Sequence, residues 1–334
     1  MIHQITVRLV TPAMIGGAKA RELDHPATIR PPSIRGQLRF WTRALAAGAG
    51  LNVYAEESAL WGNTEGGQGV VILPPLVKTL QSGSMTLFPH KTGGRAVRTR
   101  MLLPSNPAFT LRFRLQPHQT HLREKFQAVL WTWLNLGTIG RRSRRGYGSL
   151  FWEPQPDDAL HGFTEAVPAD LESPTQLTQL LNSGCSAVRS AWGAPGSAPR
   201  SLSPFFQLRS IDQIFVGQIL RNSAGIVLRE FDDSSNGIQY LIHGLNEAAD
   251  PGAATPRKEM GHAGRAPRPW GGSPNFPPRH ASPMLWRLFP CGGGFVPVLI
   301  WSPFSTTTIP PGTQVHSYLS GSLQIGNSLW GKPL

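Results

Sequence analysis

Alternating apolar and polar residues predict strands near both ends of the first 150 residues. Within residues 4–10 every second side chain is apolar, which is the period of a strand with one buried face. Residues 109–115 repeat the pattern, with arginines at polar positions. Shorter apolar runs at 70–73 and 149–152 predict two further strands.

Helical spacing follows the first of these strands. Within residues 34–47, Ile34, Leu38 and Trp41 recur every three or four positions and predict an apolar stripe on a helix. The preceding Pro-Pro-Ser is a helix-start signal with Ser33 as its N-cap. Residues 121–136 predict a second long helix with an aromatic stripe, and residues 56–61 a short one.

This order of elements predicts the fold class. Strand, helix, strand, strand, helix, strand is the βαββαβ order of a ferredoxin-like, RRM-like α+β domain, with both helices on one face of the sheet. The basic segment 89–103 reads as a loop with weak hairpin character. We therefore expect an N-terminal ferredoxin-like domain over residues 1–155.

The rest of the chain predicts a second α+β domain over residues 156–334. Gly and Pro together number 67 in the 334 residues, which indicates many turns and long loops. We expect helical pieces, strands and one mobile Pro/Gly-rich insertion. The helices are expected at 174–181, 187–192 and 211–220, the strands at 205–208 and 296–301, and the insertion at about 249–283.

The charge is concentrated in the first half. Residues 1–150 hold 20 Lys/Arg and 6 Asp/Glu, whereas residues 151–334 hold 12 and 13. Only 6 of the 32 basic residues are lysine. Because arginine forms forked contacts with phosphates and stacks on bases, this balance favours a nucleic-acid partner.

Two arginine runs carry most of this signal. On the predicted helix, Arg35, Arg39 and Arg43 recur every four residues, and none has an acidic residue four positions away to explain it. Residues 137–149 place four more arginines between glycines that allow close backbone approach. Such runs suit phosphates, although a solvated helix face and a solvated basic hairpin are the plain alternatives.

Several classes of function find no support. The glycine cluster at 66–69 lacks the Gly-Lys-Ser/Thr ending of a P-loop. Cys185 and Cys291 are the only cysteines and form no zinc motif or disulfide framework, and no other metal or cofactor motif is present. No signal peptide is visible, and no apolar run approaches the roughly 20 residues of a membrane span. We expect a soluble cytoplasmic protein without a cofactor.

Several short motifs occur along the chain. They are the Gly16-Gly17-Ala18 turn after Thr11-Pro12, the run from Arg30 to Trp41, Leu60-Trp61-Gly62, the arginine loop from Gly140 to Ser149, and Arg279 to Pro283 followed by Trp286-Arg287-Leu288 and the run from Phe295 to Leu299. Together these motifs resemble the RAMP superfamily of CRISPR systems, and the combination is similar to the first-numbered RAMP subunits of type III-B (Cmr) effector complexes.

The resemblance implies tandem ferredoxin-like domains and a non-catalytic role in antiviral defence. Such subunits sit on the guide 3′-end side of the complex and help to capture target RNA. The partners implied are CRISPR guide RNA, target RNA and other RAMP subunits. The residues expected to contact RNA are Gly16, Gly17, Lys19, Arg30, Arg35, Arg39, Arg43, Arg141, Arg142, Ser143, Arg144, Arg145 and Tyr147.

An endoribonuclease that processes CRISPR repeat RNA is the alternative. Metal-free RNA cleavage needs a general base and a general acid, and His118, His121 and Tyr147 are the candidates. Asp24 and His25 occupy a loop where a metal-assisting aspartate could lie, although an ordinary loop turn is the better interpretation. Glu56 and Glu57 are expected to neutralise arginines instead of binding a metal.

Overall fold

The computed structural model describes ten segments of the chain, and every structural statement below concerns these residues. They are residues 2–17, 23, 28–77, 79–92, 95–193, 214–222, 224–231, 238, 284–301 and 323–324. Predicted features at 205–208 and 249–283, together with Lys19, Asp24 and His25, lie outside the described residues.

The first sheet has the ferredoxin-like strand order. Its four antiparallel strands lie in the order β4-β7-β1-β8, which is 2-3-1-4 along the chain. Helix α1 follows the first strand and helix α3 follows the third, so the βαββαβ prediction for this region is confirmed. The elements are β1 (Ile2–Leu9), α1 (Pro31–Gly48), β4 (Val71–Leu76), β7 (Phe109–Arg114), α3 (Arg123–Leu136) and β8 (Leu150–Glu153).

Several boundaries differ from expectation: the short helix expected at 56–61 starts at Val53, and both long helices start elsewhere. Helix α1 starts at Pro31, with Arg30 at the N-cap position, so the prediction of Ser33 as N-cap is wrong. Proline fits the first helical turn, because its φ is already helical and its missing N–H has no partner to lose there. The second long helix starts two residues late, because Pro117–Leu122 forms a 3-10 helix (η1) before α3.

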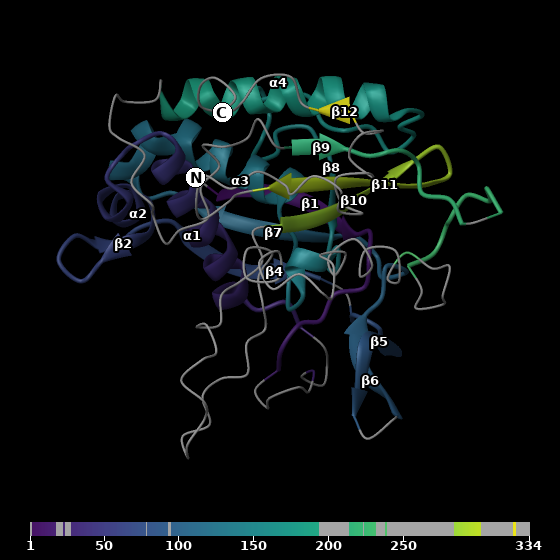
Figure 1. The fold of residues 1–334 in the computed structure, drawn as a ribbon. Coiled ribbons are helices and arrows are strands. Elements are labelled where there is room, and N and C mark those ends of the chain that lie inside the picture. Colours follow the sequence, from purple (N-terminus) through teal and green to yellow (C-terminus); the bar gives the residue numbers. More distant parts are fainter. Residues whose placement is uncertain are drawn as a thin grey trace, which may run out of the picture.

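The basic segment 89–103 belongs to a two-stranded hairpin whose register shifts between Thr86 and Lys91. Strands β5 (Ser82–Thr92) and β6 (Arg95–Leu102) pair antiparallel and project from the body of the chain (Figure 1). A second, much smaller hairpin, formed by β2 (Gly62–Asn63) and β3 (Gly67–Gln68), follows helix α2 (Val53–Trp61).

A second sheet has the same strand order as the first. It runs β10-β11-β9-β12, again 2-3-1-4 along the chain, and its neighbours are antiparallel. The predicted helix at 211–220 is wrong in its described part, because Ile214–Val216 pairs with β11 as a strand. The strands are β9 (Ile214–Val216), β10 (Met284–Cys291), β11 (Gly294–Trp301) and β12 (Leu323–Gln324).

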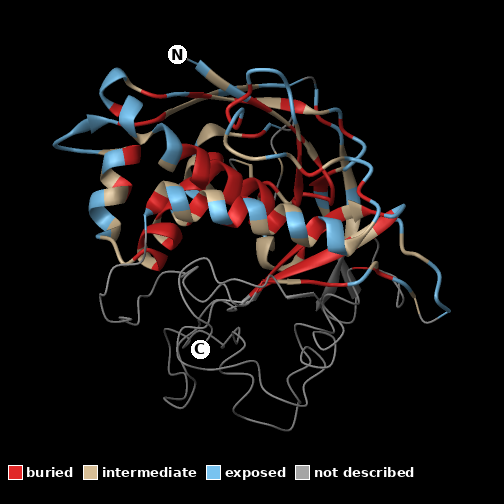
Figure 2. Ribbon diagram, turned by 90° about the horizontal axis from the view of Figure 1, so that it is seen from above, coloured by how far each residue is buried: buried red, intermediate tan, exposed pale blue. Residues whose placement is uncertain are grey.

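Helix α4 (Pro174–Trp192) replaces the two helical pieces expected there. It packs on α3 at Gly184, where a Cβ would lie 1.8 Å from the Trp131 ring, so only glycine allows this close approach. Buried residues of α3, α4 and both sheets form one continuous core (Figure 2). No helix in the described part of the chain is both long and apolar enough to cross a membrane.

Candidate nucleic-acid interface

The arginine-rich segment 137–149, called the basic loop below, is fastened to the chain that follows β1. The amide of Arg141 donates to the Met14 carbonyl at 2.8 Å, and the amide of Gly148 donates to the Pro12 carbonyl at 2.9 Å. The Thr11 hydroxyl donates to the Gly146 carbonyl at 2.6 Å. These bonds hold a highly charged segment in one conformation.

The glycines of the basic loop serve its own packing. Gly140, Gly146 and Gly148 have φ of 89°, 77° and 69°, the left-handed region that favours glycine. A Cβ at Gly140 would lie 2.6 Å from the Met14 carbonyl oxygen, and one at Gly148 would lie 1.9 Å from that of Ile139. The positive φ expected from the sequence is observed, but the close approach is to the protein's own backbone.

The other side of the basic loop rests on the second sheet. Arg287 of β10 is 1% exposed, and its Nη1 donates to the Gly137 carbonyl at 2.6 Å. Its Nη2 donates to the Leu150 carbonyl, so one guanidinium holds both ends of the loop. Burial lowers the pKa of Arg287 to about 9, because a charge removed from water is destabilised. Near neutral pH the side chain is therefore still a cation.

The arginine side chains of the basic loop are exposed to different degrees. Arg141 is exposed, whereas Arg142, Arg144 and Arg145 are half-buried around the 3-10 turn Ser143–Arg145 (η2). Burial lowers the pKa of Arg144, and burial followed by repulsion from Arg145 lowers that of Arg142. An anion placed beside these groups would favour their charged forms, as expected for a phosphate-binding surface.

The arginines of α1 are engaged within the protein. Arg39 donates through Nε, and Arg43 through Nη1 at 2.8 Å, to one oxygen of the buried Glu57 carboxylate on α2. Arg35 donates to the Trp61 and Val70 carbonyls, the latter at 3.3 Å. The expectation that Glu57 neutralises arginines is confirmed. For Glu56 the expected arginine is wrong, because its carboxylate pairs with Lys125 at 2.7 Å.

The Gly16-Gly17 turn brings two distant arginines together. Arg30 donates through Nη2 to the Gly16 carbonyl at 2.6 Å and to the Gly17 carbonyl at 3.2 Å. The Arg141 guanidinium lies beside the same turn, where a Cβ on Gly16 would be 3.5 Å from Nη2. The start of α1 and the basic loop thus meet at one place.

A cavity of about 330 Å³ lies between α1 and the basic loop, and we call it the α1–loop cavity. Both arginine runs reach it, through Arg43 and Arg144. Its wall also carries the Phe40 ring and the Gln37 amide, which are both half-buried. The lining residues are Gly36, Gln37, Phe40, Trp41, Arg43, Gly137, Thr138, Ser143, Arg144 and Leu285.

Tyr147 does not lie at this surface. It is 2% exposed, and its ring meets that of Phe231 edge-on, 4.8 Å between centroids. Its side chain therefore belongs to a small core cluster beneath the basic loop, and contact with RNA would require that cluster to open.

Gly36 is an exposed glycine in the middle of α1 that the fold does not require. A Cβ at this position would have no atom within 4 Å. Because glycine weakens a helix by roughly 0.5–1 kcal/mol relative to alanine, Gly36→Ala is expected to raise the free energy of unfolding by about that amount. Urea denaturation of the two proteins measures the difference, and a loss of stability would contradict the expectation.

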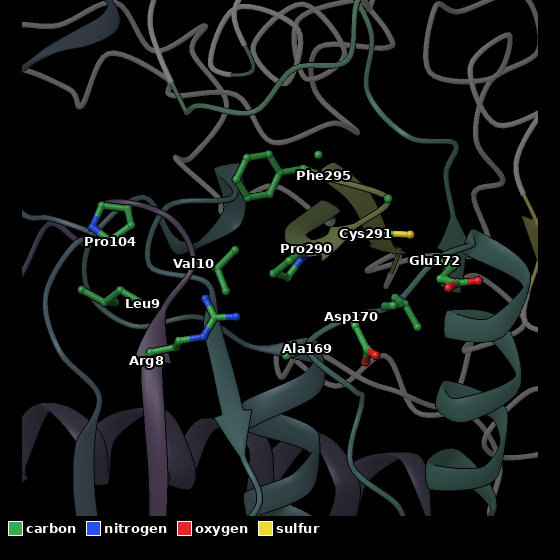
Figure 3. A pocket seen from close by; sticks show the side chains of 14 residues that line it. Arg8, Leu9, Val10, Pro104, Ala169, Asp170, Glu172, Pro290, Cys291 and Phe295 are labelled. Carbon is green, nitrogen blue, oxygen red and sulfur yellow. The ribbon is translucent and has the colours of Figure 1, made fainter.

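A second cavity, of about 550 Å³, lies near the end of β1 (Figure 3). Arg8 on its wall is paired with Glu153 at 3.1 Å, and the exposed carboxylates of Asp170 and Glu172 also line it. This balance of charge disfavours a polyanion, so the α1–loop cavity is the better candidate.

The groups needed for catalysis do not gather at the α1–loop cavity. None of its described lining residues is a histidine or a carboxylate. His118 and His121 are exposed on η1, which packs against α2 through Gln119. Within the described ranges, no group of three His, Cys, Asp or Glu side chains could hold a metal ion.

Comparison with known proteins defines the class. Residues 6–150 match the RAMP superfamily, in agreement with the resemblance noted in the motifs of this region. A search of curated protein sequences found no match.

One solved structure of similar fold is that of Cmr1 from Pyrococcus furiosus. Its crystal structure in the apo form matches 99% of this chain and 99% of its own, with 16% identity and a TM-score of 0.51, which shows a shared fold. Two chains from structures of Type III-B Cmr-beta bound to cognate target RNA match more weakly. The first covers 91% of this chain and 94% of its own at 10% identity (TM-score 0.47), the second 46% and 58% at 16% (TM-score 0.33), and these scores are too low to define the fold.

The sequence did not predict the hydrogen-bond partners of two residues that organise this interface. Arg287 appeared only as part of a motif, although one arginine within the apolar run of β10 is unusual enough to signal a buried charge. Glu57 was expected to neutralise arginines, but nothing local in the sequence indicated which ones.

Proposed function

We propose that this protein is a non-catalytic RNA-binding subunit of a type III-B (Cmr) CRISPR ribonucleoprotein. It lies on the guide 3′-end side and helps to capture target RNA for antiviral defence in the cytoplasm. Its partners are guide RNA, target RNA and neighbouring RAMP subunits. The observation that carries the proposal is the meeting of the basic loop with α1, on a domain of the RAMP superfamily.

The hydrogen bonds that hold the basic loop support a role in RNA binding. Four arginines repel one another, so holding them in one conformation costs free energy that a bound polyanion would offset. The loop is nonetheless fastened on both sides, by the chain after β1 and by Arg287. A rigid cationic loop loses little conformational entropy on binding, which favours affinity.

The proposed contact residues are the exposed or half-buried polar groups of the basic loop and the turn beside it. We assign phosphate contacts to Arg141, Arg142, Arg144 and Arg145, and a hydrogen bond to Ser143. The turn beside the basic loop is shaped by Gly16, Gly17 and Arg30. The arginines of α1 are hydrogen-bonded within the protein and add positive electrostatic potential; they are Arg35, Arg39 and Arg43. Lys19 is proposed to extend the same surface. We leave the buried Tyr147 out of the set.

The projecting hairpin supplies a further basic element. No Asp or Glu lies between Glu65 and Glu124, a stretch that includes all of β5 and β6. A run of cations with no acidic residue near them along the chain favours a polyanionic partner. We propose that the hairpin extends the RNA-binding surface away from the domain.

We also propose that the chain consists of two ferredoxin-like domains, residues 1–155 and 156–334. The shared 2-3-1-4 strand order of the two sheets supports this division.

Labelled single-stranded RNA tests the proposed function against the nuclease alternative. The full chain is expected to bind RNA with an affinity that falls steeply with salt, because neutralised phosphates release counterions. The RNA should remain intact with and without Mg²⁺. Affinity that is flat across salt concentrations would contradict the proposal. Cleavage that His118→Ala or His121→Ala abolishes would establish the endoribonuclease instead.

A further inference from the structure

The α1–loop cavity is larger than phosphate binding requires. Its volume of about 330 Å³ lies at the lower end of the roughly 300–1,000 Å³ typical of sites for small organic ligands. A phosphate contacted by surface arginines needs no such hollow. The cavity therefore fits a ligand that has an organic group as well as a negative charge.

The chemistry of the lining matches a nucleobase. The half-buried Phe40 ring, packed edge-on against Trp41 at 5.2 Å, offers a flat apolar surface. Gln37 adds an amide that can both donate and accept hydrogen bonds, which suits the edge of any base. Single-stranded RNA is commonly recognised by stacking of unstacked bases on aromatic rings and arginine planes, together with hydrogen bonds to their edges.

The rim of the cavity places phosphate-binding groups beside this lining. Arg144 and Ser143 enter it from the basic loop, and the Thr138 hydroxyl donates to the Ser143 carbonyl at 3.0 Å, which holds the rim. Gly36 lies on the α1 side of the cavity, where a Cβ would have no atom within 4 Å. A glycine that weakens the helix yet leaves the wall open is explained by a ligand that approaches the α1 backbone.

We propose that the α1–loop cavity holds one unstacked nucleobase of the bound RNA, stacked on Phe40, while the basic loop contacts the flanking phosphates. This inference rests on the proposed function and assigns a base-binding site within it. Stacking tolerates every base, so the site adds affinity without demanding a sequence.

Abasic RNA separates base binding from phosphate binding. Oligouridylate and an abasic ribose-phosphate strand of equal length carry the same charge, so the phosphate contribution is matched. The full chain is expected to bind oligouridylate about tenfold more tightly, as one stacked base contributes. Phe40→Leu, which keeps an apolar side chain without a ring, should remove that preference and leave the salt dependence unchanged.

Two further variants guard against an effect on folding. Gly36→Leu keeps a good helix former and fills the open wall, so it should also abolish the tenfold preference while melting no lower than the parent. Tyr54→Leu removes an aromatic ring that is 71% exposed on α2, outside the cavity, and should keep the preference.

The outcomes distinguish the two proposals. Equal binding of both strands by the parent protein, or an undiminished preference in folded Phe40→Leu, would overturn the base site while leaving the RNA-binding function in place. Failure of the parent protein to bind either strand would overturn the proposed function, and the base site with it.

Discussion

Replacing Arg141, Arg142, Arg144 and Arg145 together by alanine is expected to lower RNA affinity on the order of a hundredfold at low salt. The reason is the loss of as many as four phosphate contacts from one rigid loop. Each contact to a single strand contributes roughly 0.7 to the slope of log affinity against log salt, so the slope should fall by about 3. Binding titrations across a salt series measure both quantities.

A control variant with the same net charge separates the loss of phosphate contacts from the loss of positive charge. Alanine at Arg114, Arg123, Arg189 and Arg221 removes the same four charges from elements outside the interface. This control should retain most of the affinity and nearly the full salt slope. Equal losses in the two variants would show that net charge alone attracts RNA. Arg141→Ala, at the exposed position, provides a smaller change if the fourfold variant unfolds.

Arg287→Met is expected to lower the free energy of unfolding by about 2–4 kcal/mol and to weaken RNA binding. Methionine leaves the Gly137 and Leu150 carbonyls without the donors that hold both ends of the basic loop. Hydrogen bonds to a charged group contribute roughly 1.5–3 kcal/mol each, and relief of the buried charge offsets part of that loss. Urea denaturation and RNA titration of folded protein report the two effects.

Two control variants accompany Arg287→Met: lysine at the same position, and methionine at an arginine on the surface. Arg287→Lys keeps the charge but cannot reproduce the forked contact, so it should recover only part of the stability. Arg221→Met alters an exposed arginine and should change stability by less than about 0.5 kcal/mol. An unchanged urea midpoint in Arg287→Met would show that the basic loop does not depend on this residue.

Local pattern was sufficient for most elements of the first sheet. The alternation in β1 and β7 and the apolar stripes of α1 and α3 are short-range properties, and the structure places these elements close to the predicted positions. The strand at Ile214–Val216 was mistaken for part of a helix, because a short apolar run fits either period and pairing with β11 decides between them. For helix α4 the sequence predicts two separate pieces, because the local pattern does not show that Gly184 packs on Trp131.

The sequence by itself determined the charge imbalance, the motifs that resemble the RAMP superfamily and the order of elements that form the first sheet, because composition and periodicity are properties of neighbouring residues. Only the tertiary structure decided which cations are paired within the protein. Glu57 from another helix holds Arg39 and Arg43, and Arg287 reaches a carbonyl 150 residues away. Tyr147, predicted at the interface, lies in the core instead. Hydrogen bonds and ion pairs depend on a few ångströms in space, and residues far apart along the chain come within that range only when the chain folds.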